Sequence, residues 1–149
     1  MIKKIAFSTV LAGILVFVFA LTALASPLEE SNSEPKSSDY LKSYSVYLTA
    51  IGDNQLKVVF SSVAKNVMTS VGVWEIVIDK KVAGSWSYDR TLSHVYYSNF
   101  LRSNAAQHAS SVTFSGVPGT QYRVTIMAYA ANSYGSDTKP ATSNSVTCY

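Results

Sequence analysis

The feature that most constrains the fold of this chain is a period-two alternation of apolar and polar residues, which recurs in short stretches after Tyr40. Its longest example occupies residues 122–130, where every second residue is apolar. Successive side chains of a β-strand point to opposite faces, so this alternation places the apolar residues on one face of a sheet. It predicts half-buried strands and argues against an amphipathic helix. The apolar members of this stretch are Tyr122, Val124, Ile126, Ala128 and Ala130.

Six further stretches show alternating apolar and polar residues, and they are separated by turn residues such as Gly52-Asp53-Asn54 and Asp79-Lys80-Lys81. In the third strand, Trp74, Ile76 and Ile78 are expected to share one face, and Gly84 is expected to form a bulge in the fourth. About seven short strands in a domain of this size predict an all-β antiparallel sandwich of the immunoglobulin type. The segment 99–108 is expected to be irregular or to hold a short helix. The six expected strands are residues 44–50, 56–60, 74–78, 82–88, 112–114 and 141–148.

The first 25 residues have the organisation of an export signal, which would form a helix ahead of the domain. Lys3 and Lys4 precede an apolar core, and Ala23-Leu24-Ala25 provides the small-x-small pattern at which signal peptidase cleaves. The apolar stretch is also long enough to cross a bilayer, so a retained anchor is the alternative. Residues 26–41 are expected to be a polar linker and residues 42–149 the folded domain. We therefore expect a secreted protein that meets the membrane only through the leader before cleavage.

Charge and cysteine content exclude several classes of protein. Only 14% of the residues are charged, and removing Lys3 and Lys4 with the leader lowers the net charge from +3 to +1. This balance lacks the basic footprint of a nucleic-acid-binding protein. A single cysteine, Cys148, excludes an intramolecular disulfide and a multi-cysteine metal site. We expect no cofactor and no nucleic-acid partner.

One stretch, VTFSGVPGTQYRVTIMAYAANSYG at residues 112–135, resembles the E-strand, turn and F-strand of fibronectin type III domains. The resemblance implies that Tyr122 packs inward while its hydroxyl bonds to the backbone a few residues upstream, as in a tyrosine corner. Pro118 and Gly119 would form the turn before it. Val124 occupies the position where antibody domains carry a cysteine, which favours the disulfide-free version of the fold.

Two positions depart from the fibronectin pattern. Gly116 stands where these domains usually carry a leucine, and Val117 or Phe114 is expected to fill that space. Phe60 is expected to replace the tryptophan of the second strand. The whole chain is also similar to a group of small exported proteins of Gram-positive bacteria. The shared segments include VGVWEIVID and SYGSDTKPATSNSVT. This second resemblance supports export and the fold, but it implies no activity.

The residues that could carry catalysis form no recognised arrangement. His94 and His108 are fourteen residues apart without a metal-ligand spacing, and both are expected to be solvated loop histidines. No G-x-S-x-G motif or phosphate-binding loop occurs, and Glu75 is expected to face solvent opposite Trp74. Cys148 is expected to be an apolar or idle thiol, with an intermolecular disulfide as the alternative. The chain is therefore predicted not to be an enzyme and to hold no metal.

An aromatic cluster is the strongest candidate for a binding surface. Exposed tryptophan and tyrosine rings bind sugars or protein partners with little loss of entropy. The alternative is that these rings cap an open edge of the sandwich, and the neighbouring Arg90, His94 and Arg102 would attract anionic wall polymers only weakly. The cluster comprises Trp86, Tyr88, Tyr96, Tyr97 and Phe100.

The leading hypothesis is thus a secreted, non-catalytic module that binds an extracellular or cell-surface protein or glycan. A second hypothesis is an antagonistic protein of bacteriocin type, because GSWSY and VYYSNF resemble the aromatic, serine-rich pattern of the lactococcin-972-like bacteriocins. A third is a secreted hydrolase that uses His94 or His108.

Overall fold

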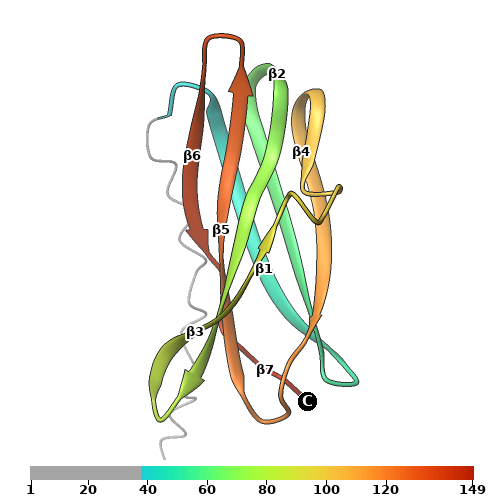
Figure 1. Ribbon diagram of the computed structural model, residues 1–149, viewed down its shortest axis with the longest axis vertical. Helices are drawn as coiled ribbons and strands as arrows, with labels where there is room; N and C mark the ends of the chain where they lie inside the picture. The colour runs from blue at the N-terminus through green and yellow to red at the C-terminus, as the bar shows by residue number, and fades with distance from the viewer. Residues whose placement is uncertain (1–37) are drawn as a thin grey trace, which may run out of the picture.

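The computed structural model describes residues 38–149, which form an all-β protein with seven antiparallel strands in one strongly curled sheet (Figure 1). The leader and most of the linker lie outside the described residues. Within residues 38–149, no helix has the length and apolar character needed to cross a membrane. The strands are β1 (Leu41–Gly52), β2 (Gln55–Val82), β3 (Ser85–Ser93), β4 (Leu101–Ser115), β5 (Gln121–Asn132), β6 (Gly135–Thr142) and β7 (Val146–Thr147).

Strand β2 is 28 residues long and organises the sheet. Its first half, residues 55–63, lies between β1 and β4. Its second half, residues 70–82, pairs with β5 on one side, and on the other side with the start of β4 at residues 70–72 and with β3 at residues 75–82. Figure 1 shows β2 rising to one end of the molecule and returning, with β4 beside it. The second and third predicted strands, at 56–60 and 74–78, are therefore the two halves of one continuous strand.

The two halves enclose a single apolar core. Their inward residues are almost completely buried, and β5 contributes its whole apolar face, as the alternation predicted. Phe60 is 1% exposed and lies at the centre of this core. Each buried aliphatic or aromatic side chain stabilises the fold by about 1.5–3 kcal/mol relative to exposure, so the core is what holds the curled sheet closed. The inward residues of β2 are Leu56, Val58, Phe60, Val71, Val73, Ile76 and Ile78.

Three local predictions were wrong. Gly84 is not a bulge: with Ala83 it forms the two-residue turn between β2 and β3, and both have positive φ. The segment 99–108 holds no helix, because residues from Leu101 onward belong to β4 and pair with β2. The predicted last strand, 141–148, is replaced by β6, which starts six residues earlier at Gly135, and by the two-residue β7. The polar sequence of β6 hid it, since it lies at the sheet edge and only Ala141 is buried.

Trp74 does not share the inward face of Ile76 and Ile78. The pairing between β2 and β5 shifts between Val73 and Glu75, so Trp74 is an extra residue in a β-bulge. The bulge turns the indole outward, and 40% of Trp74 is exposed. Glu75 is half-buried on this same outer side, where it pairs with Met127.

The packed fold begins before the expected domain boundary. Ser38 is buried and Leu41 starts β1, although the sequence assigned both to the polar linker. The side chain of Asp137 on β6 accepts hydrogen bonds from the Ser38 hydroxyl and from the Tyr40 backbone N–H. This carboxylate therefore ties the start of β1 to the edge strand β6.

The segment before β5 has the geometry of a tyrosine corner. Tyr122 is 1% exposed, and its hydroxyl accepts a hydrogen bond of 3.0 Å from the Val117 N–H. Gly119 has a φ of +77°, and exposed Pro118 precedes it in the turn. Phe114 packs edge-on against Tyr122 with 5.7 Å between ring centroids, whereas Val117 is exposed. The expectation that Val117 or Phe114 fills the space at Gly116 was wrong, because the side chains nearest to that space are Leu56, Tyr122 and Cys148.

Candidate functional site

The five aromatic residues of the predicted cluster do not form one surface. Phe100 is 0% exposed and packs edge-on against Phe60 at 5.4 Å, so its assignment to a binding surface was wrong. The Phe100 carbonyl accepts a bond from the Val73 N–H and lies where a Cβ of Gly72 would be. The missing side chain of Gly72 thus lets the chain approach β2 closely enough to bury the ring.

The other four rings lie apart from one another. Tyr97 is half-buried and stacks on Phe100 with 5.0 Å between centroids, which makes it a cover for the core. Tyr96 is 85% exposed in the turn after β3, and Tyr88 is 62% exposed on β3. None of the ring–ring contacts in residues 38–149 joins Trp86 to these side chains.

Trp86 instead has two cationic neighbours. The guanidinium carbon of Arg123 lies 4.5 Å from the indole centroid and the Lys81 ammonium lies 5.6 Å from it. Lys81 pairs with Trp86 across the β2–β3 hairpin, and Arg123 lies on β5 opposite Asp79. The Asp79 carboxylate accepts a bond of 3.1 Å from the Arg123 Nε, which fixes the guanidinium over the ring.

A hollow of about 270 Å³ lies beside this ring. Its wall contains two cations, one indole, and hydroxyl and amide groups, but no carboxylate. The three classes of group complement an anion, a sugar face and sugar hydroxyls, respectively. The lining residues are Lys81, Trp86, Gln121, Arg123, Thr142, Ser143 and Ser145.

A second aromatic group lies around Trp74. Its indole centroid is 3.8 Å from the His94 ring and 4.8 Å from the Tyr129 ring. His94 Nδ1 is 3.0 Å from the Trp74 carbonyl oxygen, and since a carbonyl only accepts, Nδ1 carries the proton. The backbone N–H of His94 donates to the same oxygen. The three rings are thus held in fixed positions before any ligand arrives.

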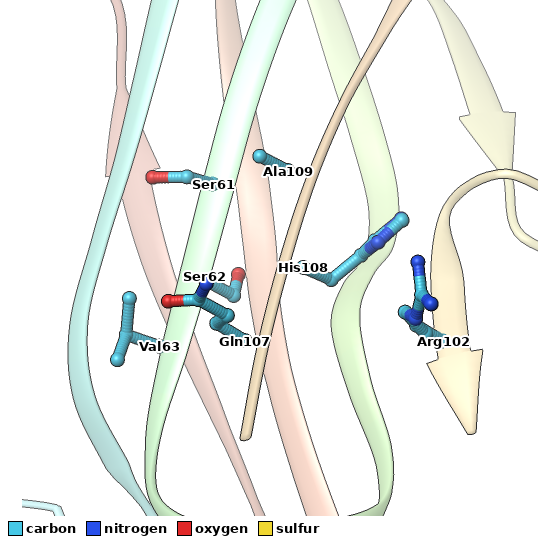
Figure 2. A pocket seen from close by; sticks show the side chains of 7 residues that line it. All are labelled: Ser61, Ser62, Val63, Arg102, Gln107, His108 and Ala109. Carbon is cyan, nitrogen blue, oxygen red and sulfur yellow. The ribbon is translucent and has the colours of Figure 1, made fainter. Parts of the chain in front are cut away.

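Figure 2 shows another hollow, of about 280 Å³, between β2 and β4. The side chains of His108 and Arg102 lie on one side of it, and those of Ser61 and Val63 lie on the other. His108 Nε2 donates a bond of 2.7 Å to the Asn99 carbonyl, and the Ser62 hydroxyl donates to the Gly72 carbonyl. Two of the polar side chains of this hollow are therefore engaged by backbone carbonyls.

The structure shows what each histidine contacts, which bears on the hydrolase hypothesis. His94 bonds to the Trp74 carbonyl and His108, a residue of β4 and not of a loop, bonds to the Asn99 carbonyl. Neither ring is hydrogen-bonded to a hydroxyl or carboxylate within residues 38–149. In this part of the chain, no three of the His, Cys, Asp and Glu residues lie close enough together to hold a metal ion.

An ionic cluster joins β2 to β3 through Asp89. Asp89 is the extra residue of a bulge in β3, and its carboxylate contacts Lys80 at 2.9 Å and Arg90 at 2.6 Å. Desolvation raises the pKa of the Asp89 carboxyl, but the bonds from Lys80 and Arg90 outweigh it, so that the pKa lies below its ordinary value. The same bond raises the pKa of Lys80. The Arg90 guanidinium also lies 5.9 Å from the Phe114 ring centroid, at the border of the core.

Cys148 is 1% exposed, and its thiol lies next to the open side of Gly116. Its backbone is fixed by two hydrogen bonds to the turn before β5, with Gly119 and Thr120. An intermolecular disulfide would require this end of the chain to detach, so the folded protein keeps the thiol as an apolar filler.

No protein-family model matches this chain, and no curated protein matches its sequence. Among solved structures, it is similar to a protein from Archaeoglobus fulgidus, at 14% identity and a TM-score of 0.30, over 73% of this chain and 98% of the other. A likeness this distant carries no argument about function.

The sequence identified Trp86 but not its partners, because Arg123 follows it by 37 residues and meets it only through strand pairing. One signal was available: Arg123 occupies an outward position in the alternation of β5, next to the inward Tyr122 and Val124. The Trp74 group was missed because the bulge leaves no trace in the alternation.

Proposed function

We propose that this chain is an exported, non-catalytic module that binds an acidic, carboxylate-bearing polysaccharide at the hollow beside Trp86. The observation that carries the proposal is the convergence of an indole, two cations and several hydroxyl and amide side chains on one hollow. An indole packs on the C–H face of a sugar ring, while Arg and Lys attract its carboxylate. Each group alone is common on protein surfaces, but their combination favours an anionic sugar as the ligand.

The electrostatics of the hollow favour a ligand with negative charge. Arg123 donates from Nε to Asp79, and within residues 38–149 its other N–H groups make no hydrogen bond that would compete with a ligand. Lys81 has no carboxylate within 4 Å in the described chain. Salt screens the attraction between the cations of the hollow and a bound anion, with a screening length of about 10 Å at 0.1 M ionic strength. The affinity should therefore fall as the salt concentration rises.

The fold proposal is a fibronectin type III-like sandwich. The buried Tyr122 with its hydroxyl on the Val117 N–H supports it, as does the division of the strands. β1 and β4 pair with the first half of β2, whereas β3 and β5 pair with its second half and β6 pairs with β5. Export through the leader at residues 1–25 remains part of the proposal and would bring the domain to the cell surface or the medium.

The test is a binding titration of the purified protein with three polymers. Hyaluronan offers sugar rings and carboxylates, poly(glycerol phosphate) offers charge without rings, and dextran offers rings without charge. We expect hyaluronan to bind most tightly, and Trp86→Ala to weaken its binding by about 10- to 30-fold. Equal binding of poly(glycerol phosphate) would contradict a role for the indole, and equal binding of dextran would contradict a role for the cations.

The matched control is Tyr47→Ala. Tyr47 is an exposed aromatic residue on β1, 57% exposed, on the opposite outer face of the sheet, where it pairs with Val59. Its removal should leave hyaluronan affinity unchanged. Lys81→Gln should weaken binding less than Trp86→Ala and should flatten the salt dependence. Unchanged affinity in Trp86→Ala would reject the proposed site.

A further inference from the structure

We propose that the bound polysaccharide is an extended chain that also occupies a second subsite, formed by Trp74, Tyr129 and His94. This inference rests on the proposed function, because it extends the ligand from the Trp86 hollow along the same face. The Trp86 hollow would bind a charged sugar, and the Trp74 group would bind a neutral one.

Both subsites lie on the outer face made by the second half of β2 and by β5. Along β5, Arg123 and Tyr129 alternate with the buried Val124 and Ala128, so their side chains point outward on the same side. Trp74 reaches this side through its bulge and contacts the Tyr129 ring. One ligand chain can therefore meet both groups without passing around an edge.

The spacing of the two subsites requires a polymer. Arg123 and Tyr129 are six residues apart on β5, which corresponds to about 20 Å at roughly 3.3 Å per residue. A single sugar ring cannot span that distance, whereas several linked sugars can. The outward pairs between the two subsites are Val77 with Thr125 and Glu75 with Met127. These side chains are half-buried and form the outer face between the two groups.

Charge distinguishes the two ends of this path. The Trp86 end carries Arg123 and Lys81, whereas Glu75 follows Trp74 directly in the chain. Within residues 38–149, no lysine or arginine lies over a ring of the Trp74 group. His94 uses Nδ1–H on a backbone carbonyl, which leaves Nε2 to hydrogen-bond a sugar hydroxyl. The carboxylate of Glu75 disfavours a charged sugar here, and the ligand should alternate charged and neutral units.

The three rings also hold one another in position through direct contacts. Trp74 is packed between two neighbours at 3.8 and 4.8 Å, and both His94 contacts fix that ring to the backbone. Surfaces that are ordered before binding lose little entropy when the ligand arrives. A preformed aromatic group with a 40% exposed indole is therefore suited to add affinity to a ligand already held at Trp86.

The test is a titration with hyaluronan oligosaccharides of increasing length, which alternate a uronic acid with a neutral N-acetylated sugar. We expect affinity to rise with length and then to level off once both subsites are occupied. Trp74→Ala should remove this gain, a loss of about 2- to 10-fold for long oligosaccharides, and leave the affinity of the shortest binding oligosaccharide unchanged. Tyr129→Thr provides a second variant that keeps a strand-forming residue at the position.

Two controls separate the outcomes. Tyr134→Ala removes a 91% exposed ring at the β5–β6 hairpin tip and should change nothing. Glu75→Gln should leave long-chain affinity equal or slightly higher. If Trp86→Ala weakens binding but Trp74→Ala and Tyr129→Thr retain the full length dependence, the second subsite is refuted and the first survives. If Trp86→Ala binds every length normally, the proposed function itself fails.

Discussion

The two halves of β2 are alike on the inside and different on the outside. Inward, residues 55–63 and 70–82 both contribute large apolar side chains to one core. Outward, the first half presents Ser61 beside Ser45 and Ala109, and Val59 beside Tyr47. The second half carries Lys81, with Trp86 and Arg123 beside it. The comparison teaches that the core fixes the scaffold, while one outer face holds the groups that can recognise a ligand.

The largest expected effect tests whether both halves belong to one cooperative core. Phe60→Ala in the first half and Ile76→Ala in the second should lower the free energy of unfolding by about 3–5 and 2–5 kcal/mol, respectively. Both side chains are essentially unexposed, so each truncation leaves a cavity. Urea denaturation followed by circular dichroism measures both. Separate transitions in either variant would show that the halves fold independently.

A second comparison separates the buried and exposed members of the aromatic segment after β3. Phe100→Ala should cost about 3–5 kcal/mol, because the ring is fully buried against Phe60 and Tyr97. Tyr96→Ala, at an 85% exposed position, should stay within about 0.5 kcal/mol of the parent. The same denaturation experiment applies, and equal costs would contradict the inward placement of Phe100.

The alternation of apolar and polar residues also shows how much of the fold could be predicted from the sequence. The alternation in residues 122–130 gave the inward face of β5 correctly, because a regular strand obeys period two. It failed at Trp74, where a bulge breaks the period, and at Phe100, whose burial depends on close approach to Gly72. The contact of Arg123 with Trp86 depends on pairing between distant strands, which a local pattern does not contain.

Acid should weaken the interactions that the Asp137 and Asp89 carboxylates make between strands. In Asp137, desolvation raises the pKa, but bonds from Ser38 and from the Tyr40 and Leu41 backbone outweigh it and hold the pKa below its ordinary 3.8. Asp89 is shifted in the same direction. A carboxyl with a lowered pKa stabilises the fold above its unfolded pKa, and this contribution is lost as pH falls through the folded value.

Stability should therefore decline below about pH 4. Melting temperatures measured from pH 6 to pH 2 would show this decline, and Asp137→Asn should make it shallower. Asp137 joins the start of β1 to β6, so this variant tests how much the connection between these two strands contributes to stability. A pH profile identical to that of the parent would show that the carboxylate contributes nothing.

The smallest expected effect concerns the Tyr122 hydroxyl. Tyr122→Phe keeps the buried ring but removes the acceptor of the Val117 N–H, which should cost about 0.5–1.5 kcal/mol. Chemical denaturation resolves a change of this size. No loss of stability would indicate that water replaces the hydroxyl, and hyaluronan affinity should be unaffected because the residue lies inside the core.

The most direct test of the central claim is a nuclear magnetic resonance titration of the purified protein with hyaluronan oligosaccharides. The account predicts that amide shifts concentrate in residues 81–86, 121–125 and 142–145, around Trp86 and Arg123. Long oligosaccharides should extend the shifts toward Trp74 and Tyr129. Shifts confined to the face of Tyr47 and Val59, or no shifts at saturating ligand, would contradict it.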